Sequence, residues 1–72
     1  MPATPEAILE KLAAAEKAGA DMKSPKAVVD FMLSQGEKES ILYFYKPKSV
    51  EFDFGKYHAA VEEMRQAKQK EL

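Results

Sequence analysis

His58 and Glu62 are the pair of residues in this sequence whose types and spacing best suit catalysis or metal binding. Four positions apart on a predicted helix, an imidazole and a carboxylate share one face, where they could ligate a metal ion or act as a base with its orienting acid. Two ligands are too few for a closed metal site, and neither Glu51 nor Asp53 stands at a diagnostic spacing from them. A solvent-facing histidine with a helical ion-pair partner is the simpler interpretation, so we expect no metal here.

The other groups that could carry out catalysis are each explained by local structure. Ser24 is expected to cap a helix, and Ser49 is expected to lie in a turn. Glu62 and Glu63 are neighbours on a predicted helix, so their carboxylates point in different directions and do not converge on one substrate. The sequence has no cysteine, and its three glycines stand singly, which excludes a thiol nucleophile and a glycine-rich phosphate loop. We therefore predict that the protein is not an enzyme and needs no cofactor.

Tyr45, Lys46 and Lys48 form a group with the chemistry of nucleic-acid binding. Lysines at the tip of a hairpin can contact phosphates, and a flanking aromatic ring can stack on a base. Against this, the chain has eleven basic and twelve acidic residues and a net charge of −1, whereas nucleic-acid-binding domains are usually clearly basic. Nucleic-acid binding through these three residues is therefore the alternative hypothesis.

The elements that must position these groups belong to one small domain, because a chain of 72 residues can bury only one thin core. The apolar share of 46 % and the charged share of 32 % are typical of a globular protein. No apolar run approaches the ~18–20 residues of a membrane span, and the first residues lack the basic start and apolar centre of a signal peptide. We expect a single domain over residues 1–72, in the cytoplasm, that is held together by packing alone and makes no contact with a membrane.

Two predicted helices begin with the same local signal. Thr4 and Ser24 can each cap a helix through their hydroxyl, and the proline that follows each fits the first helical position, where its missing N–H costs nothing. Apolar residues at helical spacing come next, and a single glycine follows each run and provides the stop. These patterns predict helices over about residues 5–18 and 25–35.

The remainder of the sequence changes period. Residues 40–45 are β-branched and aromatic, residues 46–49 have the composition of a turn, and residues 50–54 alternate strictly between apolar and acidic side chains. This pattern predicts an antiparallel β-hairpin over about residues 40–54. An apolar stripe then predicts a helix over about residues 55–70. The expected order is α-α-β-β-α, an α+β domain in which the hairpin packs on the helices.

The pairing across this hairpin defines two faces. With the turn centred on Pro47 and Lys48, one face carries six apolar residues and is expected to pack on the helices: Ile41, Tyr43, Tyr45, Val50, Phe52 and Phe54. The other face combines two large apolar residues with two carboxylates: Leu42, Phe44, Glu51 and Asp53. Either the first helix covers this second face, or the face is exposed and contacts a partner. Both interpretations stay open.

The exposed second face leads to the function that we favour from the sequence. We predict a small non-enzymatic protein-binding module, which acts as a regulator, an inhibitor or an accessory subunit. Its contact face would comprise Leu42, Phe44, Glu51 and Asp53. The expected partner is another protein or a second copy of the same chain.

Overall fold

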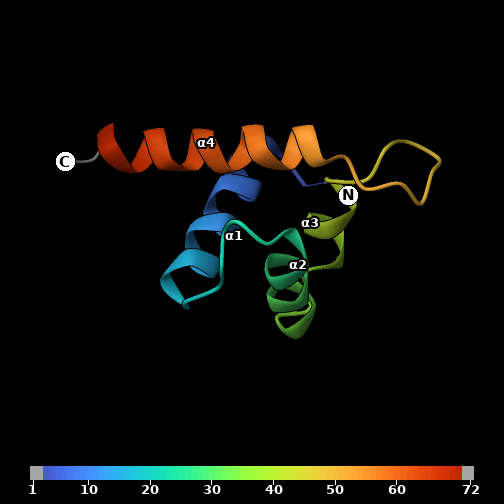
Figure 1. The fold of residues 1–72 in the computed structure, drawn as a ribbon, viewed down its shortest axis with the longest axis horizontal. Coiled ribbons are helices and arrows are strands. Elements are labelled where there is room, and N and C mark those ends of the chain that lie inside the picture. The colour runs from blue at the N-terminus through green and yellow to red at the C-terminus, as the bar shows by residue number, and fades with distance from the viewer. Residues whose placement is uncertain (1–2, 71–72) are drawn as a thin grey trace.

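Four helices make up the computed structural model, which describes residues 3–70. They are α1 (Pro5–Lys17), α2 (Pro25–Ser34), α3 (Lys38–Leu42) and α4 (Phe54–Lys70). Helix α4 runs along one side of the molecule and lies across α1, while α2 and α3 lie beside α1 on the other side (Figure 1). The three longer helices lie within one residue of the ranges that the sequence predicts.

The two predicted capping signals determine where α1 and α2 begin. The hydroxyl oxygens of Thr4 and Ser24 each accept a hydrogen bond of 3.2 Å from the backbone amide three residues later. Each of these residues has an extended backbone and is followed by proline, as the first turn of a helix requires. Gly19 and Gly36, after the helices end, have φ angles of 94° and 73°, a left-handed conformation that other residues rarely adopt.

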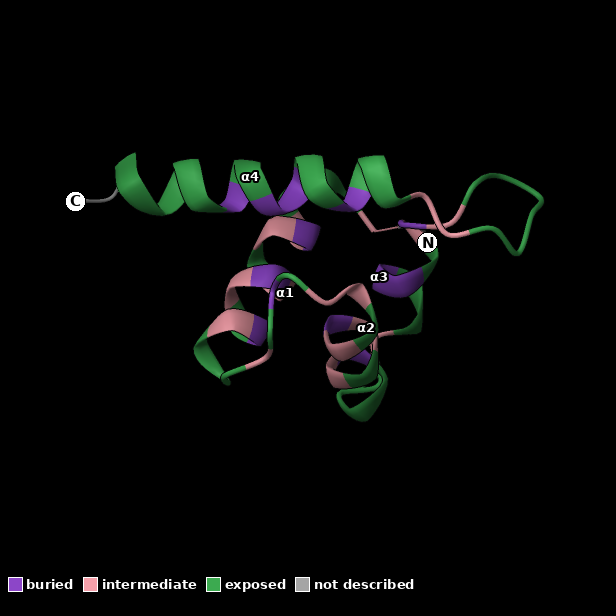
Figure 2. Ribbon diagram, viewed as in Figure 1, coloured by how far each residue is buried: buried purple, intermediate pink, exposed green. Residues whose placement is uncertain are grey.

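The core lies where α4 crosses the other helices. Figure 2 shows the buried residues of α4 on the side that faces them. Helices α1 and α4 make the most extensive contact between elements, so the first and last helices close the core. The buried apolar residues form one cluster: Ile8, Leu12, Ala15, Met22, Val28, Met32, Ile41, Phe44, Tyr57, Ala60, Val61 and Met64.

The predicted antiparallel β-hairpin over residues 40–54 is wrong, and with it the α+β class. Residues 3–70 are 66 % helix and contain no β-strand. Part of the expected first strand is the short helix α3, and the remainder continues into a turn. The reason lies in the spacing of Ile41 and Phe44, both of which are buried. Residues three apart share a side of a helical turn but point to opposite faces of a strand, so the helical turn buries both in one core, whereas a strand would need cover on both faces.

Residues 43–53 form a projecting loop, which we call the 43–53 loop (Figure 1). Its two sides meet at one antiparallel bridge, between Tyr45 and Phe52, whereas the expected register paired Tyr45 with Val50. The amide of Lys46 donates to the carbonyl of Glu51 at 3.0 Å, and a second bond of 2.7 Å closes the base of the loop. No helix covers the exposed tip, and two extended segments without such cover do not continue into a stable ladder.

None of the helices within residues 3–70 combines the length and the apolar character needed to cross a membrane. Helix α4 spans 17 residues, but its exposed side and its last turns are polar.

Candidate functional site

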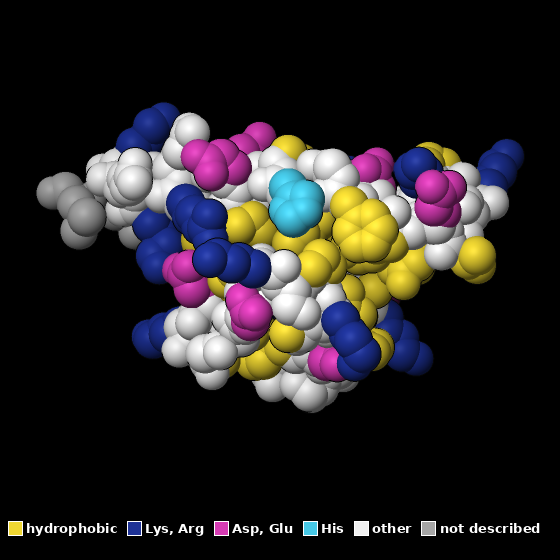
Figure 3. Space-filling model, viewed as in Figure 1, with side chains coloured by type: hydrophobic (Ala, Val, Ile, Leu, Met, Phe, Trp, Pro, Cys, Tyr) yellow, Lys and Arg dark blue, Asp and Glu magenta, His cyan; other side chains and the backbone are white. Residues whose placement is uncertain are grey.

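Three large apolar side chains near the 43–53 loop face solvent. Leu42, at the end of α3, is 66 % exposed, Val50 in the loop is 95 % exposed, and Phe54, the first residue of α4, is 58 % exposed. In the view of Figure 3, hydrophobic side chains gather beneath the start of α4, next to the base of the loop. Isolated exposed apolar residues are ordinary on protein surfaces, but a group of them on one region points to a contact surface.

Two shallow hollows give this region its shape. The first has a volume of about 450 Å³ and lies along the outer part of the loop; it is lined by Leu42, Tyr45, Lys46, Pro47, Lys48, Ser49 and Val50. The second has a volume of about 290 Å³ and lies between the loop and α2; it is lined by Pro25, Lys26, Val29, Tyr45, Phe52 and Phe54. Tyr45 lines both hollows, so the two are adjacent. We call the residues of the two hollows together the apolar loop surface.

An aromatic cluster anchors this surface to the core. The ring of Phe52 lies 5.5 Å from that of Tyr45 and 5.0 Å from that of Phe54. On its inner side the same ring lies 6.0 Å from Phe44 and 6.0 Å from Tyr57, both fully buried. Aromatic pairs at these separations stabilise beyond their buried area. The rings of Tyr45 and Phe54 on the surface therefore pack, through Phe52, against buried rings of the core.

Tyr57 fixes the start of α4 from inside the core. Its hydroxyl donates a hydrogen bond of 2.8 Å to the backbone carbonyl of Met22, in the connection between α1 and α2. Burial raises the pKa of the Tyr57 phenol, the negative charge of Asp21 raises it further, and Arg65 opposes both. The phenol is therefore neutral at neutral pH, as its role as a hydrogen-bond donor requires.

Asp53 and Lys56 join the loop to α4. The Asp53 carboxylate accepts a hydrogen bond of 3.0 Å from the amide of Lys56, which is the bond that a helix N-cap makes. The ammonium group of Lys56 then lies 4.0 Å from the centre of the Tyr43 ring, a cation–π contact between the two ends of the loop. Both contacts involve Lys56, so this residue connects the first turn of α4 to the start and the end of the loop.

Lysines supply the charge around the hollows. Lys46 pairs with Glu51 at 3.0 Å across the loop, and Lys26 pairs with Asp30 at 2.8 Å on α2. Hydrogen bonding to the partner carboxylate raises the pKa of both lysines, and the charge of that carboxylate adds to the effect. Lys48 lines the outer hollow and makes no ion pair within residues 3–70.

The structure does not bring the four residues of the predicted contact face together. Leu42 is exposed on the apolar loop surface, whereas Phe44 is completely buried. Glu51 is exposed and paired with Lys46, and Asp53 caps α4. Phe44 packs on Phe52 and Tyr57 in the core while Leu42 faces solvent, so the two apolar residues do not share one face.

Sequence reasoning missed Val50 and Phe54 as surface residues, because strand alternation assigned them to the core. One signal in the sequence indicated exposure. Val50 follows directly after a turn of proline, lysine and serine, residues that are typical of exposed loops. Of the residues in the alternative hypothesis, Tyr45 is half-buried between the two hollows, Lys46 is held by its carboxylate partner, and Lys48 is exposed.

Within the described residues, His58 and Glu62 are not joined by a hydrogen bond or an ion pair. Both are exposed, and the Glu62 carboxylate accepts a hydrogen bond of 3.4 Å from the amide of Gln66. The His58 ring packs against the ring of Tyr57, 5.5 Å away. Within the described part of the chain, histidine and carboxylate side chains do not gather in any group of three or more that could hold a metal ion.

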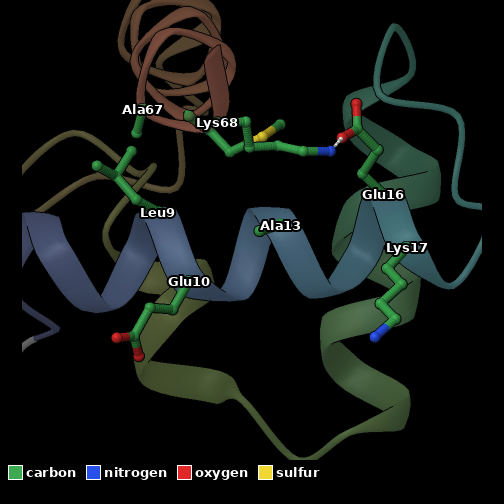
Figure 4. A pocket seen from close by; sticks show the side chains of 8 residues that line it. Leu9, Glu10, Ala13, Glu16, Lys17, Ala67 and Lys68 are labelled. Carbon is green, nitrogen blue, oxygen red and sulfur yellow. Dashed lines mark hydrogen bonds and ion pairs between the residues drawn. The ribbon is translucent and has the colours of Figure 1, made fainter. Parts of the chain in front are cut away.

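A third hollow, of about 500 Å³, lies between α1 and α4 (Figure 4). Leu9, Ala13 and Ala67 form part of its walls. The side chain of Lys68 crosses it from α4 and pairs with Glu16 on α1. Because the chain's own ion pair spans this hollow, we assign it to the packing of α1 against α4.

Comparisons with models of protein families, with curated proteins and with solved structures found no match to this chain. No relative therefore supplies a function by similarity. The assignment of function rests on the geometry and chemistry of the apolar loop surface.

Proposed function

We propose that this protein is a small non-enzymatic protein-binding module, a regulator, inhibitor or accessory subunit, which contacts its partner through the apolar loop surface. The observation that carries the proposal is the exposure of Leu42, Val50 and Phe54 beside two adjacent hollows. Together these residues replace the hairpin face that the sequence predicts.

The energetic argument concerns what this small domain leaves outside its core. Full burial of a leucine, valine or phenylalanine side chain contributes about 1.5–3 kcal/mol. A domain of this size has few other sources of stability, because it has no disulfide to supplement its core. Three large apolar side chains on one surface are therefore a substantial reserve of binding free energy for a partner.

The position of the surface favours a protein over a small molecule. Small-molecule sites are concave and bury about 70–90 % of the ligand. Here Val50 and its neighbours stand on a loop that projects from the helices (Figure 1). A partner that encloses the loop from several sides covers such a surface, whereas a small molecule would remain largely in water.

Substitutions at the exposed positions test the proposal without disturbing the core. Leu42→Glu and Val50→Glu place a charge on the surface, and Ala14→Glu adds the same charge to the exposed side of α1. Tagged wild-type protein and the three variants are used to capture partners from lysate of the source cells, with and without nuclease treatment. We expect one stoichiometric partner that the wild type and Ala14→Glu retain and that both surface variants lose.

Two results would contradict the proposal. If a partner bound Leu42→Glu and Val50→Glu as well as it bound the wild type, the contact surface would lie elsewhere. If the captured material disappeared on nuclease treatment and depended on Lys46 and Lys48, the alternative hypothesis of nucleic-acid binding would replace it. Circular dichroism of each variant checks that the helical fold is intact.

A further inference from the structure

The hollows of the apolar loop surface combine apolar walls with charge of one sign. The charged residues that line them are Lys26 in the inner hollow and Lys46 and Lys48 in the outer one. No aspartate or glutamate lines either hollow within the described residues. A segment that fits both features carries apolar side chains for the hollows and carboxylates for the lysines.

The acidic residues nearest to this surface already have partners within the chain. Glu51 pairs with Lys46, Asp30 pairs with Lys26, and Asp53 caps α4. The two ion pairs are solvent-exposed, and exposed pairs add little to stability. A carboxylate on a bound partner can therefore bind Lys26 or Lys46 at little cost in free energy, either beside the chain's own carboxylate or in its place. At Lys48 it displaces no ion-pair partner of residues 3–70.

We infer that the partner binds through an acidic segment with apolar anchors, which fill the hollows on both sides of Tyr45 while its carboxylates contact Lys26, Lys46 and Lys48. This inference rests on the proposed function and adds the chemistry of the partner to it. The apolar anchors supply most of the affinity, and the carboxylates supply selection against neutral and basic sequences.

A second copy of the chain fits this surface less well. A two-fold contact would place the same patch on both sides and so bring the lysines of one copy toward those of the other. The exposed apolar residues Leu42, Val50 and Phe54 lie on the same surface as the lysines, so a two-fold contact that uses them brings like charges together. We therefore favour a different protein as the partner.

Nucleic acid also carries negative charge, but it does not match the apolar part of the surface. Leu42, Pro47 and Val50 line the outer hollow, and they offer no hydrogen bonds to phosphates or base edges. Among the described residues that line this hollow with Lys46 and Lys48, Tyr45 is the only one with an aromatic ring on which a base could stack. A protein segment can contact both the apolar residues and the lysines, whereas a nucleic-acid strand would contact only the lysines and Tyr45.

Selection from a displayed random-peptide library tests the inference. The library is selected on the full chain and depleted on the Leu42→Glu, Val50→Glu double variant, so that only peptides that depend on the surface remain. We expect the remaining peptides to be enriched in aspartate and glutamate next to leucine, phenylalanine or other apolar residues. Surface-dependent peptides that are neutral or basic would overturn the inference but not the proposed function. A selection that yields no surface-dependent peptide would overturn both.

Binding of the most enriched peptide, followed by fluorescence anisotropy, then tests the role of the lysines. Lys48→Glu is expected to weaken binding about fivefold to tenfold, which corresponds to an exposed charge contact that has been reversed. Lys70→Glu is the matched control. It makes the same change in net charge, and Lys70 lies at the opposite end of α4 from the loop. Equal affinity of the two variants would overturn the inference.

A short poly(dT) oligonucleotide serves as the competing probe in the same assay. We expect it to bind at least tenfold more weakly than the selected peptide at moderate salt, and the peptide to keep most of its affinity when the salt is raised. Tighter binding of the oligonucleotide, lost in Lys48→Glu, would assign the surface to nucleic acid instead.

Discussion

The hydroxyl of Tyr57 donates a hydrogen bond of 2.8 Å to the backbone carbonyl of Met22, across 35 positions of sequence. The bond lies in the core and joins α4 to the connection that precedes α2. The same ring packs on Phe44, which is buried in the core, and on Phe52, which lines the inner hollow of the apolar loop surface. A single side chain thus ties the last helix to the α1–α2 connection and to the base of the surface.

Removal of the Tyr57 hydroxyl should destabilise the fold without changing its packing. In Tyr57→Phe the buried Met22 carbonyl loses its donor, which costs about 1–3 kcal/mol in the free energy of unfolding. Urea unfolding followed by circular dichroism measures the loss. Tyr43→Phe is the control, because the Tyr43 hydroxyl makes no hydrogen bond within residues 3–70. Equal stability of the two variants would mean that the bond to Met22 contributes nothing.

The raised pKa of Tyr57 predicts a loss of stability at alkaline pH. The unfolded phenol titrates near 10.0, and burial raises its pKa in the folded state, so folding favours the neutral form. The contribution is fully present below about pH 10 and is lost as the pH rises through the folded pKa. The difference in unfolding free energy between the wild type and Tyr57→Phe, measured from about pH 8 to pH 11, isolates this term from other titrating groups. We expect the difference to shrink over the upper part of that range, and a constant difference would contradict the assignment.

Truncation of Phe44 should lower the stability of the fold strongly, whereas truncation of Leu42 should hardly change it. Phe44→Ala removes a fully buried ring and should cost about 3–5 kcal/mol, which is enough to unfold much of so small a domain. Leu42→Ala removes a side chain that is 66 % exposed and should change stability by less than about 0.5 kcal/mol. Thermal unfolding compares the two. A stable Phe44→Ala protein would contradict the placement of Phe44 in the core.

The Asp53 cap should matter for the start of α4 more than for the remainder of the domain. Asp53→Ala leaves the Lys56 amide without its acceptor and should cost about 1 kcal/mol. Asp53→Asn keeps an acceptor oxygen and is expected to retain most of the stability. Amide hydrogen exchange checks the location of the effect: exchange should accelerate in the first turn of α4 in the alanine variant only. Uniform acceleration along the whole helix would indicate a global effect rather than a cap.

The three longer helices could be predicted from the sequence because each signal is local. Thr4 and Ser24 stand directly before prolines, and the apolar residues that follow keep a helical spacing. Such signals depend on a few neighbouring residues and hold whatever the remainder of the chain does. The apolar stripe of α4 is equally clear, and its buried residues, from Tyr57 to Met64, follow the helical period.

The segment around Ile41 and Phe44 could not be assigned in this way. Its six residues are compatible with a strand by composition and too few to display a helical period, so tertiary packing decides between the two. The same ambiguity carried into the candidate site. Strand alternation placed Val50 and Phe54 inside and left the position of Phe44 open, whereas in the structure Phe44 is buried among aromatic rings and Val50 and Phe54 are exposed.

The contact between α1 and α4 also has a consequence for how the chain matures during synthesis. Ile8, Leu12 and Ala15 of α1 are buried, and the helix with which α1 makes its most extensive contact, α4, is synthesised after the other three. A nascent chain that ends before Tyr57 therefore presents this apolar stripe to solvent, where chaperones can bind it. Substitutions that weaken α4 lengthen that exposure, so their effect on yield in cells should exceed their effect on the purified protein.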